Sequence, residues 1–104
     1  MKTVASVLGL AAKAGRLLTG SAAVEEGIRH GRAQVVICAN DLSAKTIKNF
    51  KFLCEQKTIS FFTYGMIAEL GHWIGAPGRG VIAVTSNDFS KMICSLLKDG
   101  GEEP

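Results

Sequence analysis

The pattern of apolar and polar positions divides the chain into alternating predicted helices and strands. Apolar residues at helical spacing, together with residues typical of helix ends, predict helices over residues 2–14, 21–30, 44–57, 66–74 and 87–98. Short apolar or β-branched runs predict strands over residues 17–19, 34–39, 59–64 and 81–85. Because strands alternate with helices, we expect a sheet covered on both faces, a three-layer α/β/α sandwich.

Polar residues at the predicted helix ends support this division. Ser21 is expected to cap the second helix, whose acidic residues lie near its start and whose basic residues lie near its end, as the helix dipole favours. Asn87 or Asp88 is expected to cap the last helix. The glycine-rich segment 75–80, which contains Pro77, predicts a loop.

The third predicted helix is amphipathic and basic. We expect its inward face to carry Ile47, either Phe50 or Phe52, and Cys54. The outward face carries four lysines, which are Lys45, Lys48, Lys51 and Lys57. Such a row of charges is most often a solvated surface, and RNA contact is the alternative.

Composition and charge limit the classes of protein. The chain is 47% hydrophobic and 20% charged, which excludes intrinsic disorder, and no apolar run reaches the ~18 residues of a membrane span. Lys13 and Arg16 stand where a signal peptide would need its cleavage site, so we expect a cytoplasmic protein. We expect one domain over residues 1–98, with net charge +6, and an acidic flexible tail over residues 99–104. The positive charge suits a polyanionic partner, although it also suits solubility alone.

The sequence contains no arrangement typical of an enzyme or a metal site. The three cysteines, Cys38, Cys54 and Cys94, have neither zinc nor disulfide spacing and lie among apolar neighbours, so we expect buried free thiols. His30 and His72 have no nearby cysteine or paired carboxylates. We therefore expect no catalysis, no bound metal and no cofactor.

Two loops have residues suited to binding phosphate. Gly20 and Ser21 begin a helix whose free N–H groups can hold an anion, and Lys13 and Arg16 precede them. The loop 75–80 carries Arg79, whose guanidinium can bind phosphate or a guanine edge. The alternatives are a simple turn at Gly20 and a tight connector with a solvated arginine.

An ordered set of segments resembles the kink-turn RNA-binding family of ribosomal proteins. That family includes archaeal and eukaryotic large-subunit proteins and a spliceosomal member, and the ending Asp88-Phe89-Ser90 is most similar to its bacterial YlxQ-like branch. The resemblance extends over about residues 4–97. The other matching segments are Leu8-Gly9-Leu10-Ala11-Ala12-Lys13-Ala14-Gly15-Arg16, Thr19-Gly20, Ile28-Arg29 with Gly31 and Ala33, Val35-Val36-Ile37-Cys38-Ala39-Asn40-Asp41, Leu70-Gly71 with Ile74-Gly75, and Arg79-Gly80-Val81-Ile82-Ala83-Val84-Thr85.

The resemblance implies a sandwich that binds kink-turn RNA. In the family, the start of the second helix enters the RNA groove beside tandem sheared G·A pairs, and the loop before the last strand packs near a flipped-out nucleotide. It implies backbone contacts at Gly20, and it implies contacts from Asn40, Asp41 and Arg79, with apolar packing of Ile47 on the extruded base. Together with the loop analysis, the candidate RNA-binding residues are Lys13, Arg16, Gly20, Ser21, Ala22, Asn40, Asp41, Ile47, Gly78 and Arg79.

Three residues depart from the pattern Gly-x-Asn-Glu-x-x-Lys that better-studied members carry at this helix start. Ala22 and Ala23 replace the Asn and Glu that would hydrogen-bond guanine edges, and Glu26 replaces the lysine with the opposite charge. Each lost base-reading contact costs ~1–3 kcal/mol of discrimination. The departures therefore predict weaker selection among RNAs.

The sequence thus predicts a small, non-catalytic RNA-binding protein, with a central mixed four-stranded sheet, that is bacterial, monomeric and associated with ribosomes or ribosomal RNA. The alternative is a protein-interaction module on the same fold, because fold alone does not determine function. No membrane association is expected.

Overall fold

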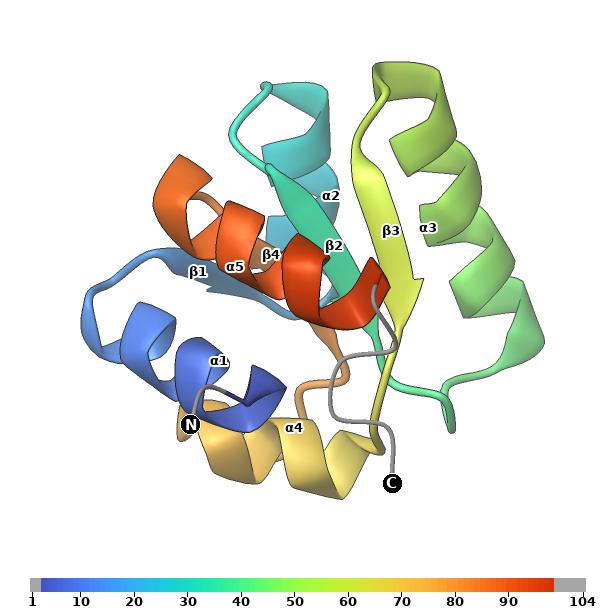
Figure 1. Ribbon diagram of the computed structural model, residues 1–104. Coiled ribbons are helices and arrows are strands. Elements are labelled where there is room, and N and C mark those ends of the chain that lie inside the picture. Colours follow the sequence, from blue (N-terminus) through green and yellow to red (C-terminus); the bar gives the residue numbers. More distant parts are fainter. Residues whose placement is uncertain (1–2, 99–104) are drawn as a thin grey trace.

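The computed structural model describes residues 3–98, so the predicted acidic tail, residues 99–104, lies outside the described residues. Within them, five helices alternate with four strands (Figure 1). In chain order, the elements are α1 (Val4–Lys13), β1 (Leu17–Thr19), α2 (Ser21–Arg29), β2 (Val35–Cys38), α3 (Ala44–Lys57), β3 (Ser60–Thr63), α4 (Ile67–Ile74), β4 (Val81–Val84) and α5 (Asn87–Lys98). The predicted order is confirmed, and the strands are up to two residues shorter than predicted.

The four strands form one mixed sheet in the order β1-β4-β2-β3. β4 is antiparallel to both of its neighbours, β1 and β2, whereas β2 and β3 are parallel. Helices α1, α4 and α5 pack together on one face, and α2 and α3 pack together on the other. The three-layer α/β/α sandwich with a central mixed sheet is therefore confirmed.

The two central strands are buried on both faces, as their uninterrupted apolar runs predict. Their side chains alternate between two core clusters because successive residues of a strand point to opposite faces. Ile37 and Ile82 pack with α1, α4 and α5, whereas Val36 and Ala83 pack with α2 and α3. The sheet thus joins two apolar layers, each of which buries one side of its helices.

Two of the predicted helix caps are wrong. Gly20 rather than Ser21 is the N-cap of α2, and Ser21 is already the first helical residue. At α5 both Asn87 and Asp88 lie inside the helix, and the Ser86 hydroxyl oxygen accepts a bond of 3.4 Å from the N–H of Phe89. In both places the first residue of the helix is polar and resembles an N-cap in the sequence. The same polar residue types occur at N-caps and in first turns, so the sequence does not distinguish the two positions.

The structure shows which of the two phenylalanines of α3 faces the core. Phe50 is buried with Cys54 in the cluster beneath α2 and α3, whereas Phe52 is exposed. The four predicted outward lysines are all exposed. Phe50 supplies the ring that the core needs, so the exposure of Phe52 requires a separate explanation.

Candidate nucleic-acid interface

Four connecting segments meet at one edge of the sheet. Cys38 at the end of β2 pairs with Thr63 at the end of β3 and with Val81 at the start of β4. Thr19 at the end of β1 pairs with Ile82, the residue next to Val81. The segments that adjoin these strand ends therefore lie together. We call the segments 20–23, 39–43, 64–66 and 75–80 the loop edge. It lies at the lower side of Figure 1, where the arrowhead of β3 points.

Backbone hydrogen bonds connect these segments to one another. Gly20 N–H donates to the Val81 carbonyl at 2.9 Å, and Ala39 N–H donates to the Gly80 carbonyl at 2.8 Å. Asn40 N–H donates to the Gly65 carbonyl, also at 2.8 Å. The loop edge is therefore a connected surface rather than four independent loops.

The Arg79 side chain lies over Gly20. An ideal Cβ built on Gly20 would be only 2.7 Å from Arg79 Nη1, which places the guanidinium against the glycine. Gly20 has φ +90° and ψ 153°, a backbone region that glycine alone occupies readily. The two loops that the sequence singled out are thus adjacent, and they are adjacent because residue 20 has no side chain.

The start of α2 has no side-chain cap among the residues that the structure describes. The N–H groups in the first turn of a helix have no intrahelical acceptor, and the helix dipole adds partial positive charge there. Ser21, Ala22 and Ala23 are all exposed. Together with the Arg79 guanidinium, this helix start offers several donors to one anion.

Asn40 and Asp41 have structural partners within the loop edge. The Asn40 side-chain amide donates to the Gly65 carbonyl at 3.2 Å. One Asp41 carboxylate oxygen accepts from Ile67 N–H at 2.8 Å and so satisfies a donor at the start of α4. These bonds give Asn40 and Asp41 a structural role that does not depend on RNA. Asn40 is nevertheless exposed beside the other loops.

Close packing supports the loop that carries Arg79. An ideal Cβ on Gly71 in α4 would lie 3.0 Å from the Ala76 carbonyl oxygen and 3.1 Å from Pro77 Cα. One on Gly80 would lie 2.8 Å from an Ile67 side-chain carbon. This supporting role had no signal in the sequence. Segment 64–66 was not among the predicted binding loops, although Gly65 directly after a predicted strand is typical of a turn.

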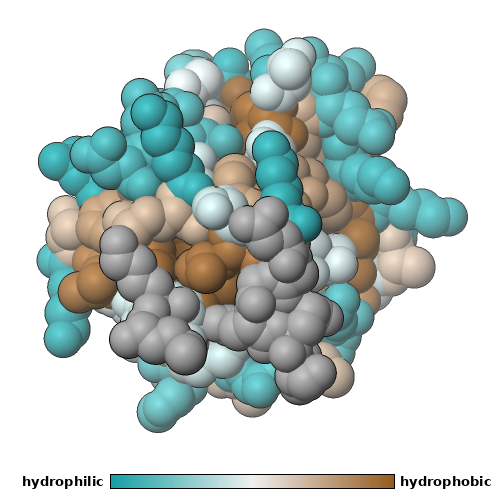
Figure 2. Space-filling model, viewed as in Figure 1, coloured by the Kyte–Doolittle hydropathy of each residue, from teal (hydrophilic) through white to brown (hydrophobic). Residues whose placement is uncertain are grey.

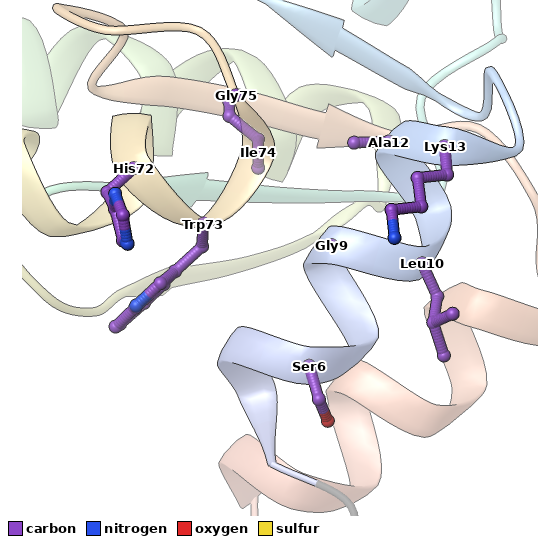
Figure 3. Close-up of a pocket in the computed structure, with 9 residues that line it drawn as sticks. All are labelled: Ser6, Gly9, Leu10, Ala12, Lys13, His72, Trp73, Ile74 and Gly75. Atoms are coloured by element: carbon purple, nitrogen blue, oxygen red, sulfur yellow. The ribbon is translucent and has the colours of Figure 1, made fainter.

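Arg16 does not lie with Gly20 and Arg79. Arg16 precedes β1, and its carbonyl accepts from Thr85 N–H at the end of β4, which is the opposite edge of the sheet. Lys13 lines a hollow of about 620 Å³ between α1 and α4, together with Leu10, His72 and Trp73, and this hollow reaches Gly75 at the start of the segment that carries Arg79 (Figure 3). Ile47 is half-buried against the α2–α3 core, one turn into α3, and Gly78 is exposed in the Arg79 loop.

The charges near the start of α2 are mixed. Glu25 forms an ion pair with Arg29 at 2.6 Å, whereas Glu26 is exposed. In the view of Figure 2, hydrophilic residues gather along much of the right-hand rim, where α3 lies. Lys45 and Lys48 of α3 are exposed and line a groove with Ser21 and Glu25, so they add positive charge beside α2.

The described residues hold no group of three or more side chains that could ligate a metal ion. Burial raises the pKa of the Cys38 thiol to about 12 and that of Cys54 to about 11, so both stay protonated and are poor nucleophiles near neutral pH. Across residues 3–98, every helix is too short or too polar to cross a membrane.

Comparisons with known proteins show the family to which the chain belongs. The model of the ribosomal protein L7Ae/L30e/S12e/Gadd45 family matches residues 2–94. The RNA-binding protein YlxQ of Bacillus subtilis is 34% identical over 91 residues, which cover 88% of this chain and 91% of that protein. The RNA-binding protein YlxQ of Enterococcus faecium is 33% identical over 93 residues, 89% of each chain.

Two solved structures have the same fold. A protein of unknown function from Bacillus halodurans superimposes with a TM-score of 0.89 and 34% identity, covering 91% of this chain and 96% of that one. The 15.5 kD RNA-binding protein of Giardia lamblia superimposes with a TM-score of 0.81, covering 92% of this chain and 85% of that one. Its sequence identity is only 16%, so it supports the fold alone.

Proposed function

Because this chain belongs to the ribosomal protein L7Ae/L30e/S12e/Gadd45 family, we propose that it binds structured RNA through the loop edge. The observation that carries the proposal is the placement of the Arg79 guanidinium directly over Gly20, at an uncapped helix start. A guanidinium and free backbone N–H groups are the donors that a phosphate accepts most readily. The relatives named for RNA binding support the same conclusion.

A sharply bent RNA suits this surface better than a straight duplex does. Bending brings phosphates of both strands close together, where Arg79 and the first turn of α2 can contact them at the same time. Because Gly20 has no side chain, the Arg79 guanidinium lies close to the free N–H groups of the helix start, and both can contact one phosphate. We propose that the preferred RNA is kink-turn-like and that ribosomal RNA is its source.

Base recognition is expected to be weak. Ala22 and Ala23 are exposed at the helix start and have no side-chain polar atoms to read base edges. Glu26, also exposed, repels phosphate. Exposed Ser21, Asn40 and Gly78 supply the remaining polar contacts in this proposal, and Ile47 supplies an apolar surface for an extruded base. The protein would act without catalysis, as a monomer in the cytoplasm.

The same residues favour a second candidate function, a protein-interaction module. A helix start with two exposed alanines is less polar than RNA readout requires and suits a protein surface. Capture of partners from lysate, with and without nuclease treatment, distinguishes the two. Partners that survive nuclease would support the protein-interaction module, and partners lost with the RNA would support the RNA proposal.

The proposal is tested by titrating the protein against a kink-turn RNA and against a straight duplex of equal length, at several salt concentrations. We expect tighter binding to the kink-turn and affinities that fall steeply as salt rises, because phosphate neutralisation dominates binding. Equal affinity for both RNAs would refute the kink-turn preference. No binding to either RNA at low salt would refute the RNA function.

A further inference from the structure

A shallow groove of about 650 Å³ runs between α2 and α3, outside the loop edge except at Ser21. Its α2 side is formed by Ser21 and Glu25. On the α3 side, the polar and exposed aromatic residues are Lys45, Thr46, Lys48, Asn49 and Phe52. The volume falls within the range of ligand sites, ~300–1,000 Å³.

Three of these residues form one stripe along α3. Lys45, Asn49 and Phe52 are spaced by four and three residues, which places them on the same side of the helix. The stripe rises ~10 Å along the helix axis. The Phe52 side chain is 55% exposed, and the core does not need it because Phe50 is buried one half-turn earlier. An exposed ring on a basic helix face is therefore available to a ligand.

The chemistry of the groove fits a single-stranded polynucleotide. The Lys45 and Lys48 ammonium groups can neutralise phosphates, the Asn49 amide can hydrogen-bond a base edge, and the Phe52 ring offers a face on which a base can stack. Glu25 is the one carboxylate among the groove residues, and its ion pair with Arg29 at 2.6 Å compensates its charge. The groove is thus complementary to a polyanion that carries aromatic bases.

Ser21 joins the groove to the loop edge. It lines the groove and directly follows Gly20, over which Arg79 lies. We propose that the α2–α3 groove binds a single-stranded extension of the RNA whose structured part occupies the loop edge. This inference rests on the proposed function and extends it, since it specifies a second contact and the form of RNA that makes it.

Two RNA probes test the groove: a kink-turn hairpin with blunt ends, and the same hairpin with an oligouridine extension. The wild-type protein is expected to bind the extended probe about tenfold more tightly, because one stacked base contributes ~1–3 kcal/mol. Phe52→Ala should remove that gain and leave the affinity for the blunt hairpin unchanged. Circular dichroism melting should show that the variant remains folded, since the ring is exposed.

Matched variants separate the groove from general charge and from general apolar surface. The pair Lys45→Gln and Lys48→Gln should lose the gain, whereas Lys51→Gln with Lys57→Gln removes the same charge from α3 outside the groove and should retain it. Leu10→Ala, which truncates a side chain that is 57% exposed on α1, should also retain it. Equal binding of both probes by the wild type, or an equal loss of the gain in both lysine pairs, would overturn the proposal that the groove binds the extension. The proposed function would still stand. No binding of either probe would overturn both proposals.

Discussion

Replacing Ala22, Ala23 and Glu26 with Asn, Glu and Lys is expected to tighten binding to a kink-turn RNA by at least about thirtyfold. Two base-reading side chains, at ~1 kcal/mol each as a lower bound, account for this factor, and the charge reversal at residue 26 adds to it. All three positions are exposed, Ala22 and Ala23 in the first turn of α2 and Glu26 in the second, so the new side chains do not disturb the core. The measurement is a titration of each protein against the same RNA.

The gain is expected only with an RNA that contains the tandem sheared G·A pairs, so the control is a change in the RNA. Changing the tandem sheared G·A pairs to Watson–Crick pairs should remove most of the improvement, because the added Asn and Glu act on guanine edges. Circular dichroism melting should show that the triple variant folds as the wild type does. An unchanged affinity for the kink-turn, or the same gain on the Watson–Crick RNA, would mean that α2 does not meet the RNA in the proposed way.

Gly20→Ala is expected to destabilise the protein by ~1–3 kcal/mol and to weaken RNA binding at least tenfold. The strain arises because an alanine at φ +90° and ψ 153° occupies a region that is nearly restricted to glycine. Binding weakens for a second reason. The new Cβ would lie 2.7 Å from Arg79 Nη1, so the guanidinium must move away from the helix start. Thermal melting and RNA titration measure the two effects.

Gly31→Ala is the matched control for this substitution. Gly31 also has a positive φ, +72°, but an ideal Cβ there meets no atom within 4 Å. Gly31→Ala should therefore lower the melting temperature through backbone strain and leave the affinity for RNA unchanged. If both glycine variants lost RNA binding equally, the loss would reflect general destabilisation, and the contact between Gly20 and Arg79 would have no special role.

The fold could be predicted from sequence because its signals are local. The apolar runs of β2 and β4 and the helical spacing in α1 and α3 each determine one element, and their alternation implies the layers. The helix starts were less predictable. Ser21 and Asn87 resemble caps, but the choice between a residue and its neighbour depends on backbone angles that residue types do not determine.

The candidate site was predictable only in part because it depends on contacts between distant segments. Gly20 and Arg79 were both identified, yet their contact depends on the pairing of β1 with β4. Arg16 was grouped with Gly20 by sequence distance, although β1 separates them and places Arg16 at the other edge. Asp41 was identified as a candidate RNA-binding residue, and its bond to Ile67, 26 positions away, had no signal in the sequence.

The most direct test compares Arg79→Ala with Arg32→Ala in RNA titrations. Both arginines are exposed, and Arg32 precedes β2, at the edge of the sheet opposite the loop edge. We predict that Arg79→Ala lowers affinity about tenfold or more and reduces the dependence on salt by about one phosphate contact, while Arg32→Ala changes neither. Equal losses in the two variants, or none in Arg79→Ala, would contradict an RNA interface at the loop edge.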